Sequence, residues 1–159
     1  MPEENYLNIL EQSLRKKLGI LKQIRVKNEH QRVLLLDEEL APEDLEENMD
    51  AKAELVGQLE ILDQGFDEVY ERIRQQLEAG KDKYREQIRQ LQELIRQVTA
   101  ESSSIQAEEK RNYQLAEKKF ASVKKQVREV KASYKAVNQY YRNMTKTHYV
   151  DAQFLDNKK

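Results

Sequence analysis

Apolar residues recur at spacings of three and four along most of this chain, with charged residues between them. Such a rhythm is typical of an amphipathic helix that packs along one narrow face against other helices. No stretch shows the strict alternation of a half-buried strand. Only four Gly and two Pro occur in 159 residues, and 36% of the residues are charged. The pattern and the composition together predict an all-α fold.

Two breaks divide the pattern into three expected helices. Pro42 suits the first turn of a helix, and the Gly of Ala79-Gly80 suits a helix end. The first helix, rich in basic residues, and the second, rich in acidic ones, should form an antiparallel hairpin. A long third helix should then pack beside them in a coiled-coil-like, three-helix arrangement. The predicted organisation is a single helical domain over 1–144, with helices at about 4–36, 43–78 and 81–144, and a flexible C-terminal tail over 145–159.

The third helix has one ambiguous region, residues 99–112. Ser102, Glu109 and Asn112 occupy positions where the rhythm expects apolar side chains, as Lys52 does in the second helix. Ser103 followed by Gln106 could form a capping box and restart a helix there. Both an unbroken third helix and a kink within 99–112 are compatible with the sequence.

The expected lengths suggest a binding surface. At about 1.5 Å per residue the hairpin would be roughly 50 Å long and the third helix roughly 96 Å. The half of the third helix from about 116 to 144 would then lack an intramolecular partner, and an unpaired amphipathic helix is a docking site for another chain. Its apolar stripe supplies the predicted client-binding residues: Ala116, Phe120, Val123, Val127, Val130, Tyr134, Val137, Tyr141 and Met144.

Charge is distributed unevenly along the chain. From Lys110 to the end there are 13 Lys and Arg against 4 Asp and Glu, whereas the first 109 residues hold 15 against 25. This asymmetry favours either docking of the two regions on each other or an acidic partner for the basic one. The basic region carries no helix-turn-helix or bZIP-like pattern, so nucleic-acid binding is not expected.

Residues with catalytic or ligand-binding chemistry do not form a recognisable pattern. The chain has no cysteine, and its two histidines, His30 and His148, are far apart in sequence. There is no Gly-rich phosphate loop and no nucleophile elbow, and Ser102-Ser103-Ser104 has no histidine at a suggestive spacing. The sequence therefore predicts a protein that is not an enzyme and has no metal site and no cofactor.

Neither insertion into a membrane nor secretion is expected. The longest aliphatic run is Val33–Leu36, far short of the ~20 residues needed to cross a bilayer. The first residues are polar and acidic, without the apolar core of a signal peptide. The predicted location is cytoplasmic.

The chain resembles the FlgN-type flagellar export chaperones. The resemblance rests on the acidic start of the first helix, on Leu59-Glu60-Ile61-Leu62-Asp63-Gln64-Gly65-Phe66 in the second, and on the long third helix. The ending, with Tyr149-Val150-Asp151 and Phe154-Leu155-Asp156-Asn157-Lys158-Lys159, is similar to those of Gram-positive members.

This resemblance implies a non-catalytic chaperone that binds the assembly-prone helical end of hook–filament junction proteins and delivers them to the flagellar type III export apparatus. In that family the C-terminal helical region makes much of the client contact, which corresponds here to the stripe from Ala116 to Met144. The alternative is a structural coiled coil, in which the same stripe pairs two copies of the chain into a homodimer.

Overall fold

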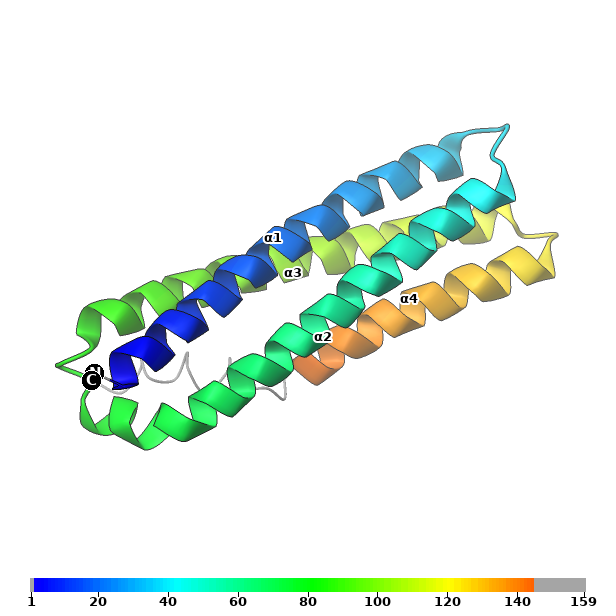
Figure 1. Cartoon of the computed structure of the whole chain (residues 1–159). Coiled ribbons are helices and arrows are strands. Elements are labelled where there is room, and N and C mark those ends of the chain that lie inside the picture. The colour runs from blue at the N-terminus through cyan, green and yellow to red at the C-terminus, as the bar shows by residue number, and fades with distance from the viewer. Residues whose placement is uncertain (1, 145–159) are drawn as a thin grey trace.

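The computed structural model of the protein describes residues 2–144. They form four antiparallel helices that run alternately up and down (Figure 1): α1 (Pro2–Leu36), α2 (Pro42–Ala79), α3 (Arg85–Lys119) and α4 (Lys124–Met144). Within 2–144 no residue belongs to a strand, so the predicted all-α class is confirmed. The tail predicted over 145–159 lies outside the described residues.

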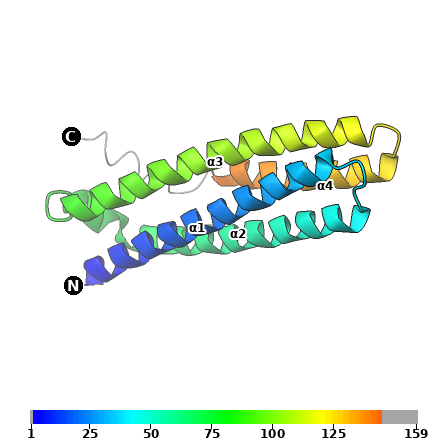
Figure 2. The same cartoon turned by 90° about the horizontal axis from the view of Figure 1, so that it is seen from above.

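The helices form a bundle in which α1 and α4 are each flanked by α2 and α3. Because α4 has 21 residues and α2 has 38, α4 covers only part of the bundle's length. Figures 1 and 2 show α4 beginning beside the α1–α2 loop and ending partway along α2. The described chain therefore has a four-helix end, near the loops at 37–41 and 120–123, and a three-helix end, near the α2–α3 loop.

The expectation of three helices is wrong in number, because the third segment turns back on itself. Helix α3 is continuous through 99–112 and ends at Lys119, and the residues 120–123 separate it from α4. The Phe120 amide donates to the Ala116 carbonyl at 2.9 Å, and the Val123 amide donates to the Phe120 carbonyl at 2.8 Å. The turn lies where α3 reaches the end of the α1–α2 hairpin, and there Lys119 Nζ donates to the Asp37 carbonyl at 2.6 Å.

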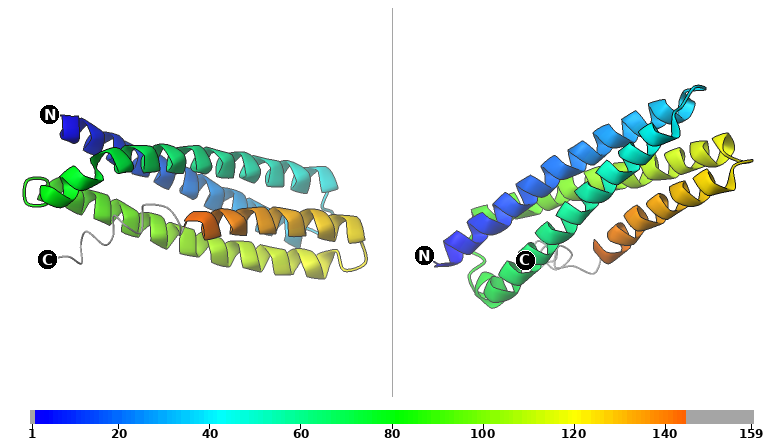
Figure 3. Two further views of the ribbon diagram at one scale, coloured as in Figure 1. Left: turned by 90° about the horizontal axis from the view of Figure 1, so that it is seen from below. Right: turned by 45° about the vertical axis from the view of Figure 1, so that its right-hand side comes forward.

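The turn has a physical cause in the lengths of the helices. Helices α1 and α3 both contain 35 residues, so a longer α3 would extend beyond its partner into water. Folding back instead buries Val130, Val137, Tyr140 and Tyr141. Helix α4 then packs against α2 and α3, and the left view of Figure 3 shows it between them. The expectation that residues 116–144 have no intramolecular partner is therefore also wrong.

The ends of α2 are explained by its local sequence. Ala41 is extended (φ −79°, ψ 125°), Pro42 occupies the first turn, and Glu43 and Asp44 place negative charge at the positive end of the helix dipole. At the other end the Gly80 amide donates to the Gln76 carbonyl at 2.9 Å. These signals make α2 a separate, well-bounded helix.

The interior contains two apolar clusters. The larger runs along α1, α2 and α3 and includes Val137, Tyr140 and Tyr141 of α4. The smaller lies at the four-helix end and consists of Leu35, Leu45, Met49, Ala116 and Val130. Helix α4 therefore contributes to both clusters and is part of the folded bundle.

Candidate functional site: the docked helix α4

Helix α4 carries most of the predicted client-binding stripe, and the structure places the stripe's nine residues at different depths. Four are buried core residues: Ala116, Val130, Val137 and Tyr141. Four are half-buried: Phe120, Val127, Tyr134 and Met144. Val123 lies in the turn and is 41% exposed. The predicted stripe is therefore divided by the turn: Ala116 lies on α3, Phe120 and Val123 lie between the helices, and the other six residues lie on α4. The part on α4 is turned toward the protein's own bundle.

Aromatic contact joins α4 to α3 beside the turn. The rings of Tyr113 on α3 and Tyr134 on α4 are 4.7 Å apart between centroids and tilted by 31°. Tyr113 and Phe120 also pack against the smaller apolar cluster, which contains Val130. Since Tyr113 and Tyr134 are both only half-buried, this contact closes the α3–α4 side of the bundle at its surface.

A buried polar junction connects the end of α4 to α1 and α2. Lys17 Nζ pairs with Asp63 Oδ1 at 2.7 Å, and the Tyr140 hydroxyl donates to Asp63 Oδ2 at 2.7 Å. Lys17 Nζ also lies 3.3 Å from the sulfur of Met144. Burial lowers the pKa of Lys17, and the Asp63 carboxylate opposes that shift. Three helices are therefore joined through one carboxylate, to which α4 contributes a neutral hydroxyl.

The next residue, Tyr141, is buried with an unsatisfied hydroxyl. Tyr141 is 2% exposed, and its hydroxyl makes no hydrogen bond with any residue that the structure describes. Burial raises the pKa of Tyr141, and Glu109, Glu108 and Asp63 raise it further. A buried hydroxyl without a partner costs about 1–3 kcal/mol. Docking of α4 therefore carries a penalty that a phenylalanine would not carry.

A second buried polar group lies within the four-helix end and involves α1, α2 and α3. Lys52 of α2 pairs with Glu109 of α3 and donates to Gln31 Oε1 of α1 at 3.1 Å. Asn112 of α3 donates to Gln31 Oε1 at 3.0 Å and to the Asn28 carbonyl at 2.9 Å. Burial lowers the pKa of Lys52, and Glu109 opposes that shift. We call these residues, Asn28, Gln31, Lys52, Glu109 and Asn112, the polar layer.

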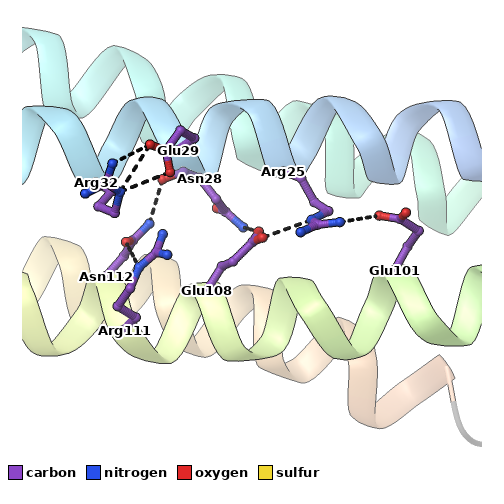
Figure 4. Close-up of polar contacts among 8 residues, drawn as sticks. All are labelled: Arg25, Asn28, Glu29, Arg32, Glu101, Glu108, Arg111 and Asn112. Atoms are coloured by element: carbon purple, nitrogen blue, oxygen red, sulfur yellow. Dashed lines mark hydrogen bonds and ion pairs between the residues drawn. The ribbon is translucent and has the colours of Figure 1, made fainter.

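Ion pairs at the surface hold α3 on α1 without any part of α4. Arg25 donates to Glu108 Oε2 at 2.9 Å and to Glu101 Oε2 at 3.1 Å (Figure 4). Asn28 Nδ2 donates to the other oxygen of Glu108 at 3.1 Å. The hydrogen bond with Glu108 is the main cause that raises the pKa of Arg25. These polar contacts between α1 and α3 thus involve no residue of α4.

Sequence reasoning missed the polar layer and Tyr140, although a signal for the layer was present. Lys52 and Glu109 both occupy seam positions of their helices, and a lysine and a glutamate on facing seams are natural partners. The polar residues within 99–112 are therefore interior groups, with Ser102, Glu109 and Asn112 all buried. The sequence contains no comparable signal for Tyr140. Its hydroxyl reaches Asp63 of α2 only because the turn at 120–123 brings α4 back along the bundle.

Comparison of the chain with protein-family models, curated proteins and solved structures finds no match. Among residues 2–144, no helix combines the length and apolar character needed to cross a bilayer. The same residues contain no group of three or more His, Asp or Glu side chains placed to hold a metal ion. What can be said of function therefore comes from α4 and the surface around it.

Proposed function

We propose that this protein is a non-enzymatic chaperone for helical, assembly-prone protein segments, of the FlgN type that its sequence resembles. Its clients would be the helical ends of hook–filament junction proteins, held until the flagellar export apparatus receives them. The observation that carries the proposal is the position of α4, a short amphipathic helix whose apolar face is only partly covered by the bundle.

The mechanism is an exchange of partners by α4. In the docked state its stripe packs on α2 and α3, and in the client-bound state the same stripe packs on a client helix. The cost of release is reduced by the buried Tyr141 hydroxyl and by the short length of α4. The hydrogen bond from Tyr140 to Asp63 opposes release. The remaining three helices keep the α1–α3 ion pairs and most of the larger apolar cluster.

Exchange also sets the affinity. When only a fraction of molecules has α4 released, the apparent dissociation constant is the intrinsic one divided by that fraction. Docking therefore protects the stripe from non-specific contacts and makes client binding depend on how tightly α4 is held.

A reversible crosslink tests the proposal. The chain has no cysteine, so Y113C with Y134C would introduce the only two thiols, on α3 and α4. A short reducible bis-maleimide would then hold α4 on the bundle. We expect a helical C-terminal fragment of a hook–filament junction protein to bind the free protein and to bind the crosslinked protein at least tenfold more weakly. Reduction of the linker should restore binding, as measured by calorimetry.

The matched control places the same crosslinker between R25C and E101C, which join α1 to α3 and leave α4 free. That crosslink should leave binding of the fragment unchanged. Equal binding before and after the α3–α4 crosslink would contradict the exchange mechanism. Failure of junction-protein fragments to bind any form would contradict the assignment of clients.

The alternative function, a homodimeric scaffold, was predicted from a stripe free to pair with a second copy. In the structure the stripe packs within its own chain, so a second copy, like a client, would have to displace that contact. Light scattering of the full chain distinguishes the two, because a scaffold is a stable dimer and the chaperone alone is a monomer.

A further inference from the structure

A groove runs between α2 and α4 on the outer surface of the four-helix end. Its volume is about 580 Å³. Its lining includes small residues from both helices: Ala53 and Gly57 from α2, and Ala132 and Ala136 from α4. A Cβ added at Gly57 would meet nothing within 4 Å, so the groove is open above this position. Side chains this small let another helix approach closely.

The charged residues that line this groove are all of one sign. Glu46, Asp50 and Glu60 of α2 and Glu129 of α4 line it, and no basic residue within 2–144 does. All four carboxylate residues are exposed. A surface of this kind attracts cations and repels anionic partners.

The charge is sorted on both helices. Between Asp37 and Glu71 there are 14 acidic residues and one base, Lys52, and that base is buried in the polar layer. Helix α4 has six basic residues and one acidic residue, Glu129, and that acidic residue is the one that lines the groove. The acidic character of the groove therefore does not reflect the composition of α4, which is strongly basic elsewhere.

We propose that this groove binds an amphipathic helix of a partner protein, one with small or aliphatic residues along its seam and Lys or Arg on both flanks. The seam would pack over Ala53, Gly57, Ala132 and Ala136, and the flanking cations would face the carboxylates of α2 and Glu129. An apolar stripe with basic flanks is complementary to a groove lined by small residues and by four carboxylates.

Binding in this groove needs α4 docked, so it does not require the proposed exchange to occur. A helix bound there stabilises the docked state, whereas a client in the proposed mechanism requires the released state. By linkage, occupation of the groove weakens client binding and client binding weakens occupation of the groove. The α3–α4 crosslink separates the two, since it blocks exchange and leaves the groove intact.

The test uses a designed helical peptide with an Ala/Leu seam and Lys flanks, titrated into the α3–α4 crosslinked protein and followed by calorimetry. A peptide with Glu in place of Lys and a non-amphipathic shuffle of the Lys peptide are the controls. We expect the Lys peptide alone to bind, with an affinity that falls as salt rises.

Two pairs of matched variants locate the binding. The triple substitution E46K, D50K and E60K should weaken the Lys peptide about tenfold or more. The control triple E47K, E54K and E68K reverses three exposed carboxylates of α2 that do not line the groove, and it should weaken binding far less. G57L should fill the groove and abolish binding, whereas G65L, also in open space on α2, should not.

Three results would overturn the inference. The first is equal binding of the Lys and Glu peptides, and the second is an equal effect of the two charge-reversal triples. The third is self-association of the chain that G57L abolishes, since the groove would then belong to a second copy. Circular dichroism of each variant verifies that the helices are intact.

Discussion

At the three-helix end the interior is filled by apolar side chains such as Leu10, Tyr70, Ile73 and Leu91, whereas the four-helix end encloses the polar layer around Lys52. Apolar layers stabilise a bundle but leave its register open to slippage, because one aliphatic side chain replaces another at little cost. Buried polar pairs do the reverse, since a shifted register leaves a charge without its partner. The three-helix end is thus filled by apolar side chains, and the end that α4 covers holds the buried charges that a shifted register would leave unpaired.

The largest effect should come from breaking the polar layer. K52M leaves Glu109 buried without its cation, and breaking a buried ion pair from one side costs about 3–5 kcal/mol. K52M combined with E109L removes both charges, and its stability should return close to the natural value. Urea denaturation of the three proteins measures this. Equal losses for the single and the double variant would show that the layer stabilises the bundle rather than its register.

Shortening one buried side chain in each end tests whether the two ends of the bundle unfold together. L10A at the three-helix end should cost about 2–5 kcal/mol and lower hydrogen-exchange protection throughout the bundle. V137A removes a smaller buried side chain, and its loss of protection should be confined to α4 and the α2 and α3 residues beneath it. Equal and global losses in both variants would mean that α4 does not open separately from the bundle.

The two adjacent tyrosines of α4 sharpen the comparison. Y140F deletes the donor to Asp63 and should loosen α4 by about 1 kcal/mol, whereas Y141F deletes a hydroxyl without a partner and should tighten it by a similar amount. Amide exchange within α4 should therefore be faster in Y140F and slower in Y141F. Under the proposed function, binding of the junction-protein fragment should be tighter in Y140F and weaker in Y141F. A shift of the same sign in both variants would contradict the assigned roles.

The sequence predicted much of the fold because its local signals agree. The spacing of apolar residues indicated helices, and Pro42 and the Gly80 region marked the ends of the first two helices. The turn at 120–123 could not be found in the same way. Phe120, Val123 and Val127 keep the helical rhythm across it, and neither Gly nor Pro marks it. The cause of the turn is tertiary, since α3 ends where its partners end.

The candidate site was predictable in part for the same reason. Helical spacing placed Val130, Val137 and Tyr141 on one face, and all three are buried together with their neighbours. Spacing does not say what covers a face, so the docked position of α4 required the structure. The groove between α2 and α4 was likewise out of reach, because it is formed by two helices whose contact depends on the turn.

The smallest effect should be a dependence of the free energy of unfolding on pH, caused by buried titratable groups. Burial lowers the pKa of Lys17 and of Lys52 below the ordinary value of 10.5. Between their lowered values and 10.5 the unfolded chain binds more protons at these groups than the folded chain. Their contribution to the free energy of unfolding therefore rises with pH in that window.

Tyr141 acts in the opposite direction above its ordinary value of 10.0, because burial raises its pKa and the folded chain there keeps a proton that the unfolded chain loses. Among these three groups, the two lysines should thus make stability rise with pH up to 10.5, and above 10.5 only Tyr141 still acts, so stability should fall. Urea denaturation across this range measures both limbs. The K52M and E109L double variant should flatten the rising limb and Y141F should weaken the falling one, whereas L10A, in the apolar end, should lower the whole curve and leave its shape unchanged. If L10A changed the shape of the curve of stability against pH, the assignment of the pH dependence to Lys17, Lys52 and Tyr141 would be contradicted.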